Sequence, residues 1–252
     1  MRARVGRFGR RFGERSGSLR EMSRSGRGLR LVTEPARHPS AGGQRVLVVD
    51  HPIVAHRLSV LRDAETDNAT FRTIVGELSA VLAYEALRDL RTAEHRVDTP
   101  VARDVVCQRV NEMVLLVPIL RAGLGMVPAI QEVLPLTEVA HVGLRRDEET
   151  LLPTVYLERL PRDLSDRRVI ICDPMLATGG SLVRVCDLVK QRGATEIHAL
   201  CLIASQPGLD AFCGQHPTVR VACVAVDQEL NSHGFIVPGL GDAGDRLFGP
   251  PA

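Results

Sequence analysis

Residues 168–181 read RVIICDPMLATGGS, and a helical pattern follows them at 182–190. The apolar start of this stretch predicts a buried strand that ends at Asp173, and the small residues after it predict a tight loop. The loop contains neither Gly-Lys-Ser/Thr nor Gly-x-Gly-x-x-Gly, which excludes a Walker loop and a dinucleotide-binding fingerprint. The stretch therefore predicts a strand, an acid, a small-residue loop and a helix, in that order.

The loop is suited to holding a phosphate group. Gly179 and Gly180 let the backbone turn tightly and approach a ligand, and Thr178 and Ser181 add hydroxyl donors. The amides of the first helical turn and the helix dipole favour an anion. The Asp173 carboxylate can accept hydrogen bonds from vicinal hydroxyls, such as those of a ribose whose 5′-phosphate occupies the loop. A chance turn before a capped helix is the alternative for this loop taken alone.

The rest of the chain alternates apolar runs with helical patterns. Continuous apolar runs predict strands at 113–119, 139–143, 168–172, 196–203 and 218–226. Helical spacing predicts helices at 51–62, 71–90, 123–133, 180–191 and 207–214. This order is typical of an α/β fold with a doubly wound, mostly parallel sheet and flanking helices. Such sheets bind ligands beyond the carboxyl ends of their strands, so a site is expected in the loops there.

The wording DPMLATGGS resembles the phosphoribosyl-diphosphate signature of type I phosphoribosyltransferases, and specifically that of the uracil phosphoribosyltransferase family. The resemblance implies that this loop binds 5-phosphoribosyl 1-diphosphate (PRPP), with Asp173 at the ribose and residues 177–181 at the 5′-phosphate. The implied PRPP-binding residues of the loop are Asp173, Pro174, Met175, Leu176, Ala177, Thr178, Gly179, Gly180 and Ser181. With three further segments and the opening HPIVAHRL at His51, the resemblance extends over residues 45–249.

Two of these segments carry arginines. In PILRAGLG at 118–125, Arg121 can hold two phosphate oxygens while the glycines let backbone amides face an anion. In the family this loop and its arginine bind the diphosphate, whereas an exposed arginine on a tight turn is the alternative for the loop alone.

The charged run at 145–150 is typical of a solvated surface. The resemblance singles out Arg146 as a second diphosphate-binding arginine on a mobile loop. Arg145 stands where relatives usually have an aromatic, and it is given no role.

The C-terminal tail at 234–249 is rich in glycine and proline and lacks a helical or alternating period, which predicts a long loop. Backbone groups held in such a loop can recognise the edge of a small heterocycle. The tail resembles the uracil-binding hood of the family, placed here at 227–249, where Phe235 replaces an expected Tyr. The resemblance assigns uracil contacts to Ile236, Gly241, Asp242 and Ala243, and Asp242 is also assigned to PRPP.

The resemblance implies a reaction that joins N1 of uracil to C1 of PRPP, giving UMP and diphosphate in pyrimidine salvage. Displacement at an anomeric carbon develops oxocarbenium character, so catalysis is expected from fixing the leaving group and offsetting its charge. The predicted catalytic residues are Asp173, Arg121 and Asp242. Pro174 stands where many relatives outside the uracil branch have a second acid, so Mg²⁺ is expected to arrive with the substrate and no protein ligand is assigned to it. Asp242 is preferred over His233 as a base for N1.

Charge is unevenly distributed along the chain. Residues 1–43 contain 11 arginines and three acids, a net charge of +8, and since the whole chain carries +2, residues 44–252 carry −6. An acidic body argues against nucleic acid as a partner, and therefore against a pyrimidine-sensing RNA-binding regulator on the same fold. A phosphoribosyltransferase for another base is the alternative among enzymes, and the hood argues against it. The resemblance also implies a GTP effector and a homo-oligomer, neither of which the sequence reveals.

Residues 1–43 are too polar to bury a core and predict a disordered Arg/Gly/Ser-rich leader, with the catalytic domain at 44–252. A transit peptide, a nucleic-acid-binding arm and a mis-assigned start are the explanations for the leader, and we prefer the last, with the protein beginning near Arg45.

No apolar run reaches the length of a membrane span. The six cysteines form no Cys-x-x-Cys pair, which favours a reducing cytoplasm and argues against structural zinc.

Overall fold

Two apolar layers pack against opposite faces of one central sheet. They are seen in a computed structural model that describes residues 45–146 and 153–249. The predictions for the leader at 1–43 and for residues 147–150 of the charged loop lie outside the described residues, as does the side chain of Arg146.

The sheet is mostly parallel. Its described strands follow the order β1-β11-β10-β8-β4-β6-β7, with β5 beside β4 and β9 beside β10. The pairing of β6 with β7 is antiparallel, and the other pairings within this sheet are parallel. The strands are β1 (Val46–Val48), β4 (Met113–Leu120), β5 (Glu138–Val139), β6 (His141–Arg146), β7 (Pro153–Arg159), β8 (Arg167–Cys172), β9 (Met175–Leu176), β10 (Glu196–Ser205) and β11 (Arg220–Asp227). The predicted doubly wound α/β fold is confirmed.

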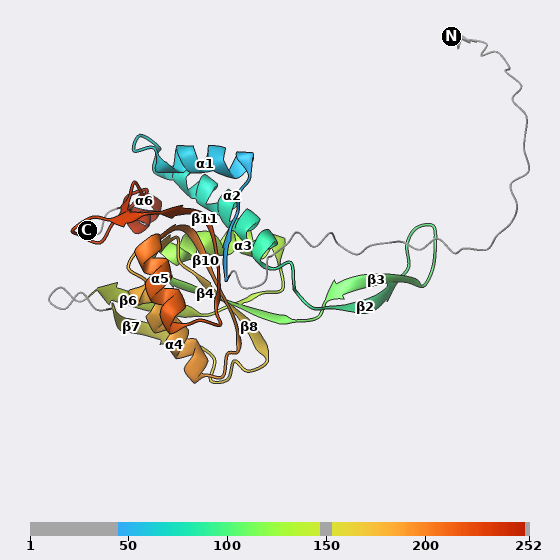
Figure 1. Cartoon of the computed structure of the whole chain (residues 1–252). Helices are drawn as coiled ribbons and strands as arrows, with labels where there is room; N and C mark the ends of the chain where they lie inside the picture. Colours follow the sequence, from blue (N-terminus) through green and yellow to red (C-terminus); the bar gives the residue numbers. More distant parts are fainter. Residues whose placement is uncertain (1–44, 147–152, 250–252) are drawn as a thin grey trace, which may run out of the picture. The chain divides into compact units, whose positions relative to one another are not determined.

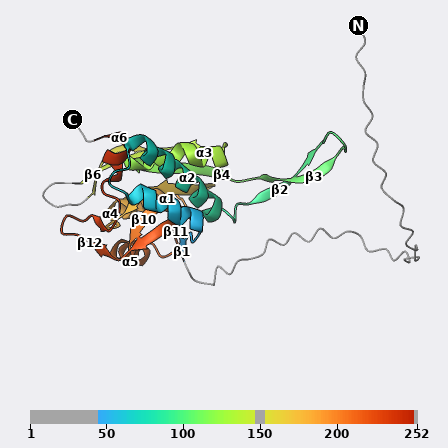
Figure 2. The same ribbon diagram turned by 90° about the horizontal axis from the view of Figure 1, so that it is seen from above.

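Helices cover both faces of this sheet. Helices α1, α2 and α3 lie over one face and α4 and α5 over the other (Figures 1 and 2). The helices are α1 (Pro52–Arg62), α2 (Asn68–Ala86), the 3-10 helix η1 (Ala122–Met126), α3 (Val127–Val133), α4 (Gly180–Gln191), α5 (Gln206–Gln215) and α6 (Ala243–Phe248). In the described part of the chain, none of these helices combines the length and the apolar character needed to cross a membrane.

The central strands are buried on both faces because consecutive residues point to opposite sides of a strand. In β8, Val169 and Ile171 belong to the layer that contains α4 and α5, whereas Ile170 and Cys172 belong to the layer that contains α2. A strand placed in this way has no polar face, which explains its continuous apolar run.

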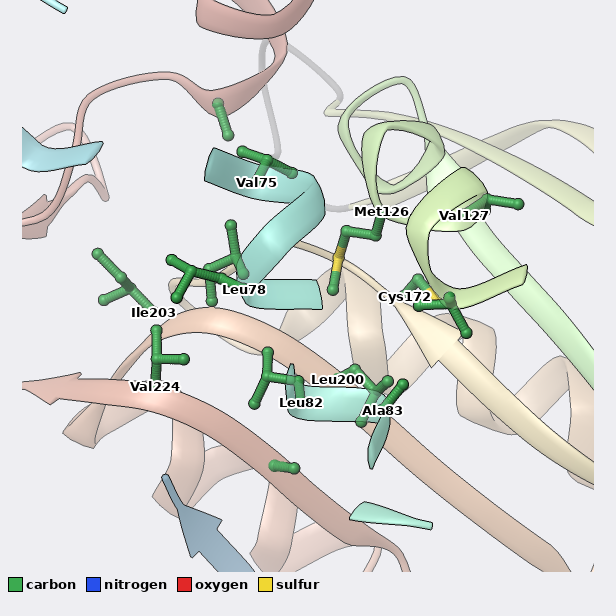
Figure 3. Packing of buried hydrophobic residues seen from close by; sticks show 14 of the residues in the cluster. Val75, Leu78, Leu82, Ala83, Met126, Val127, Cys172, Leu200, Ile203 and Val224 are labelled. Atoms are coloured by element: carbon green, nitrogen blue, oxygen red, sulfur yellow. The ribbon is translucent and has the colours of Figure 1, made fainter. Parts of the chain in front are cut away.

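Helix α2 is the main cover of its face. Its start is fixed by Asp67, whose carboxylate accepts hydrogen bonds from the amides of Ala69 (2.8 Å) and Thr70 (2.9 Å). Its buried side then packs against the sheet, and Figure 3 shows Leu78 and Leu82 beside residues of β10 and β11. The apolar spacing that predicts this helix therefore also defines the side that faces the core.

The structure differs from the sequence predictions mainly where segments lack a core-facing apolar pattern. Strands β2 (Thr92–Val97) and β3 (Val105–Val110) form an antiparallel hairpin that projects from the sheet (Figures 1 and 2). The apolar runs of the sequence do not predict this hairpin. Its residues alternate between partly buried and exposed, and among the described residues none of them joins either apolar layer. The apolar periodicity that reveals the other elements is absent here.

Smaller differences concern element boundaries. The helix predicted at 71–90 runs over 68–86, the helix predicted at 123–133 is divided into η1 and α3, and the strand predicted at 139–143 is divided into β5 and β6. The C-terminal tail at 234–249, predicted to be a loop, contains strand β13 (Ile236–Val237), which pairs with strand β12 (Glu229–Leu230) before the tail, and the short helix α6. These elements are too short for a period of 2 or 3.6 to be recognised.

A buried ionic network holds the amino-terminal edge of the sheet. Arg168, with a side chain only 4% exposed, donates to Glu112 (2.9 Å) and Asp89 (2.7 Å). Arg220 pairs with the same Asp89, and the amide of Arg91 donates to Glu112 (3.1 Å). Asp89 and Arg91 lie just before the hairpin and Glu112 just after it, so this network joins the hairpin to strands β8 and β11.

We expect Arg168→Ala to destabilise the fold by about 3–5 kcal/mol, because it leaves the buried Glu112 with only its longer ion pair to the exposed Arg91 (3.4 Å). Arg96→Ala is the control, since Arg96 and Asp104 form an ion pair whose side chains are 61% and 69% exposed. That change is expected to cost less than about 1 kcal/mol. Urea unfolding measures both values, and equal losses would contradict the burial argument.

Candidate functional site

A pocket opens at the carboxyl end of β8, where the sequence predicts a phosphate cradle. It is lined by Asp173, Met175, Leu176, Ala177, Thr178, Gly179, Ser181 and Leu182. Seven of these eight residues come from the predicted PRPP loop, and the remaining two residues of that loop, Pro174 and Gly180, do not line the pocket. The loop therefore wraps around a hollow at the start of α4.

The shape of this loop depends on Gly179. It is the N-cap residue of α4 and has φ +84°, a left-handed conformation that side chains rarely adopt. A β-carbon at this position would also come within 2.9 Å of the Gly208 carbonyl oxygen. The hydroxyl of Ser205, at the end of β10, donates to the carbonyl of Ala177 (2.5 Å) and accepts from the amide of Gly208 (2.9 Å). One serine thus holds both the cradle loop and the start of α5.

Asp173 is one of the residues that line the pocket. One of its carboxylate oxygens accepts a hydrogen bond from the amide of Met175 (3.3 Å). Burial raises the pKa of Asp173 to about 7, because desolvation of the carboxylate outweighs this one hydrogen bond. Hydroxyl donors or a cation brought by a ligand would stabilise the ionised form of this carboxylate.

The loop after β4 lies beside the end of β8. Gly123 of η1 lies so close to the end of β8 that a β-carbon at this position would overlap the carbonyl oxygen of Cys172. Arg121, between β4 and η1, is 48% exposed, and its Nη2 donates to Asp245 (3.1 Å). The predicted diphosphate loop and the cradle loop are therefore neighbours at one edge of the sheet, as expected for loops that follow adjacent parallel strands.

The C-terminal segment, residues 227–249, carries the predicted uracil-binding residues and contacts the Arg121 loop through Asp245 and Leu247. Ile236 and Ala243 are each 4% exposed and pack in the α2-side core. Gly241 has φ +80°, and the exposed Asp242 caps α6 by accepting from the amide of Asp245 (2.9 Å). One Asp242 oxygen therefore has a structural role.

An arginine from the other end of the chain holds this segment in place. Arg62, at the end of α1, forms two hydrogen bonds to Asp227 (2.8 and 2.7 Å) and a third to the carbonyl of Gly239 (2.8 Å). The amide of Gly239 donates to the same Asp227 (2.9 Å). Burial acts to raise the pKa of Asp227, but the bonds from Arg62 and Gly239 hold it below its usual range. Asp227 is therefore a charged anchor for the backbone just before Gly241.

Several residues that shape the site were missed at the sequence level: Ser205, Arg62, Asp227 and Asp245. Each acts through a contact between segments distant in the chain, and apolar periodicity does not report such contacts. His233 is exposed in a turn, where its amide donates to Asn231. Arg146 ends β6, and its predicted contact with diphosphate remains a prediction.

The site offers few protein ligands for a metal ion. Within residues 45–146 and 153–249, no group of three or more His, Cys, Asp or Glu side chains is placed to hold a metal. The oxygen of Asp173 is of the type that Mg²⁺ prefers, and the rest of the pocket is suited to an anion. These residues fit an Mg²⁺ ion bound largely by oxygens of the ligand itself.

Comparison with known proteins places this chain among one group of enzymes. A family model described as uracil phosphoribosyltransferase matches residues 48–250. The uracil phosphoribosyltransferase of Symbiobacterium thermophilum is 50% identical over 205 residues, covering 81% of this chain and 98% of the relative. That of Streptococcus pneumoniae R6 is 45% identical with the same coverage. The solved structure of the AQ2163 protein from Aquifex aeolicus superposes with a TM-score of 0.77 at 35% identity, covering 81% of this chain and 98% of the other.

The raised pKa of Asp173 predicts a pH dependence of stability. Between the ordinary pKa of 3.8 and about 7, the folded state binds more protons than the unfolded state, so stability falls as pH rises through this window. We expect Asp173→Asn to be more stable than the parent by roughly 2–4 kcal/mol at pH 8, with the gain vanishing below pH 4. Urea unfolding across this range measures it. Asp210→Asn, on the exposed side of α5, is the control. A gain for Asp173→Asn that is the same at all pH values would contradict the argument.

Proposed function

Because the chain belongs to the uracil phosphoribosyltransferase family, we propose that it joins N1 of uracil to C1 of PRPP, giving UMP and diphosphate. The observation that carries this proposal is the meeting of three loops at one sheet edge: the cradle loop, the Arg121 loop and the C-terminal segment. These loops offer an anion site, a cation and a rigid backbone, which are the three features that the two substrates require.

The cradle loop is proposed to hold the 5′-phosphate of PRPP. Its residues 177–181 surround the start of α4, where free amides and the helix dipole attract an anion. Asp173, which lines the same pocket, would accept hydrogen bonds from the ribose hydroxyls, which replace the solvent it lost on burial. The sugar is thus oriented with its anomeric carbon away from the helix.

Arg121 is proposed to bind the diphosphate leaving group. As the bond at C1 breaks, negative charge grows on the diphosphate and positive charge grows on the sugar. A guanidinium placed beforehand offsets the growing negative charge without reorganising. Arg146 is proposed to add a second cation from the end of β6. Mg²⁺, carried by the substrate, would supply further charge neutralisation on the same oxygens.

The C-terminal segment is proposed to recognise uracil through its backbone. The side chains of Ile236 and Ala243 are buried, and Gly241 offers none, so the flat edge of the base would meet amides and carbonyls. Asp242 remains the proposed group near N1, although one of its oxygens is occupied as a helix cap. Phe235, 44% exposed, contributes no hydroxyl to this recognition.

Several finer features belong to the same proposal. A role in pyrimidine salvage, a location in the cytoplasm, a GTP effector and a homo-oligomer follow from the family resemblance. All six cysteines are free thiols in the structure, which supports a reducing environment.

The reaction itself is tested by incubating the purified full chain with uracil, PRPP and Mg²⁺. We expect UMP and diphosphate in equal amounts, and failure to form UMP would refute the proposal.

Arg121→Ala is expected to lower kcat/KM for PRPP by about 10²-fold or more, the size typical of losing one charge-stabilising group. Arg57→Ala is the control, because Arg57 is 40% exposed on α1 and pairs with Glu77 rather than with a residue of the site. Equal activities of the two variants would exclude Arg121 from the site.

The anchoring of the C-terminal segment predicts a selective effect on uracil. In Asp227→Asn the charge that holds Arg62 and the Gly239 amide is lost, so the backbone before Gly241 is less well fixed. We expect the KM for uracil to rise about 5- to 10-fold, the equivalent of 1–1.4 kcal/mol, with the Kd for PRPP changed less than 2-fold. Steady-state kinetics and calorimetry measure the two quantities. A parallel rise in both would indicate general unfolding of the site.

A further inference from the structure

Helix α6 is anchored on one side by Arg246. This guanidinium donates to the carbonyls of Leu61 (2.7 Å), Asp63 (2.6 Å) and Leu240 (3.0 Å), and it lies 4.3 Å from the centre of the Phe71 ring. Hydrogen bonds to fixed carbonyls together with a cation–π contact leave such a side chain little freedom. The helix is thereby attached to the α1–α2 layer.

On its other side, α6 packs directly on the diphosphate loop. A β-carbon at Gly125 of η1 would come within 2.8 Å of the Leu247 side chain, so the two elements are in close contact. The carbonyl of Leu247 accepts a hydrogen bond from Arg72 of α2 (3.0 Å). Helix α6 is therefore a fixed platform beside Arg121.

The contact that crosses from this platform to the diphosphate loop is the pair Arg121–Asp245. Nη2 of Arg121 donates to Oδ1 of Asp245 at 3.1 Å, and the two side chains are 48% and 41% exposed. Among the described residues, Asp245 is the carboxylate with which Arg121 pairs. The remaining N–H groups of the guanidinium are not used by this bond, since a guanidinium carries five.

We propose that Asp245 is a positioning residue for PRPP binding: it holds one edge of Arg121 from the C-terminal segment and leaves the rest of the guanidinium for the diphosphate. This proposal rests on the proposed function and adds a residue to which no substrate role has been assigned above. A free arginine side chain loses rotamer entropy when it is ordered. A bond formed before the substrate arrives reduces that cost at the moment of binding.

The opposite role, in which Asp245 competes with diphosphate for Arg121, fits the geometry less well. A competing carboxylate would take two parallel N–H groups along one edge of the guanidinium, as in bidentate pairs. Here one nitrogen is engaged, and Asp245 is held on a helix that Arg246 fixes from behind. The two roles predict opposite changes in PRPP affinity.

The experiment measures the Kd for PRPP with Mg²⁺ by calorimetry, without uracil, and the KM for uracil by kinetics. We expect Asp245→Ala to weaken PRPP binding about 5-fold, while Asp245→Asn recovers most of the loss because its amide oxygen can still accept from Arg121. The KM for uracil is expected to change less than 2-fold. In an Arg121→Ala background, Asp245→Ala is expected to have no further effect, as a double-mutant cycle requires for coupled residues.

Glu77→Gln is the matched control, because Glu77 is also 41% exposed and pairs with an arginine, Arg57 at 2.8 Å. It is expected to leave both quantities unchanged. Unchanged or tighter PRPP binding in Asp245→Ala would overturn the proposal, as would equal losses with and without Arg121 or equal losses for PRPP and uracil. If the parent chain binds PRPP in the expected pattern but makes no UMP, the proposed function fails alone. If it makes UMP but Asp245→Ala binds PRPP like the parent, the positioning role fails alone.

Discussion

The burial of the central strands on both faces is the constraint from which the rest of the structure follows. Strands β4, β8, β10 and β11 contribute residues to both apolar layers, so their side chains are committed to packing. Parallel connections then bring the loops that follow these strands to a common edge. The proposed site lies at that edge, where a rigid sheet supports short polar loops.

Positive charge is supplied by a few arginines in defined positions and not by an overall basic surface. The residues from 44 onward carry −6, and yet the proposed substrate is a polyanion. Four arginines of this acidic body have distinct structural partners: Arg168 in a buried network, Arg62 on Asp227, Arg246 on backbone carbonyls and Arg121 on an exposed carboxylate. The first three are satisfied within the fold. Arg121 alone among these four is half-exposed at the sheet edge, which suits it to a mobile partner.

The sequence predicts the fold and the cradle better than it predicts the supports around them. Helix α4 begins and ends where its apolar spacing indicates, because Leu182, Val185 and Val189 face the core and Gly179 fixes its start. The hairpin β2–β3 and helix α6 do not follow this logic, since neither has a long apolar face. Contacts such as Ser205 to Ala177 and Arg62 to Asp227 join residues 28 and 165 positions apart, and no local pattern encodes them.

The C-terminal segment shows why such supports matter for a two-substrate reaction. Base recognition by backbone groups demands a rigid loop, and rigidity here comes from Asp227 and Arg246, which bind the segment to the α1–α2 layer. The same segment carries Asp245 to Arg121, the arginine proposed to bind diphosphate. The C-terminal segment therefore supports the proposed sites of both substrates. Proximity of two reacting groups can contribute several kcal/mol to catalysis only if each is held within a fraction of an ångström. A segment fixed at several points satisfies that requirement without adding a larger domain.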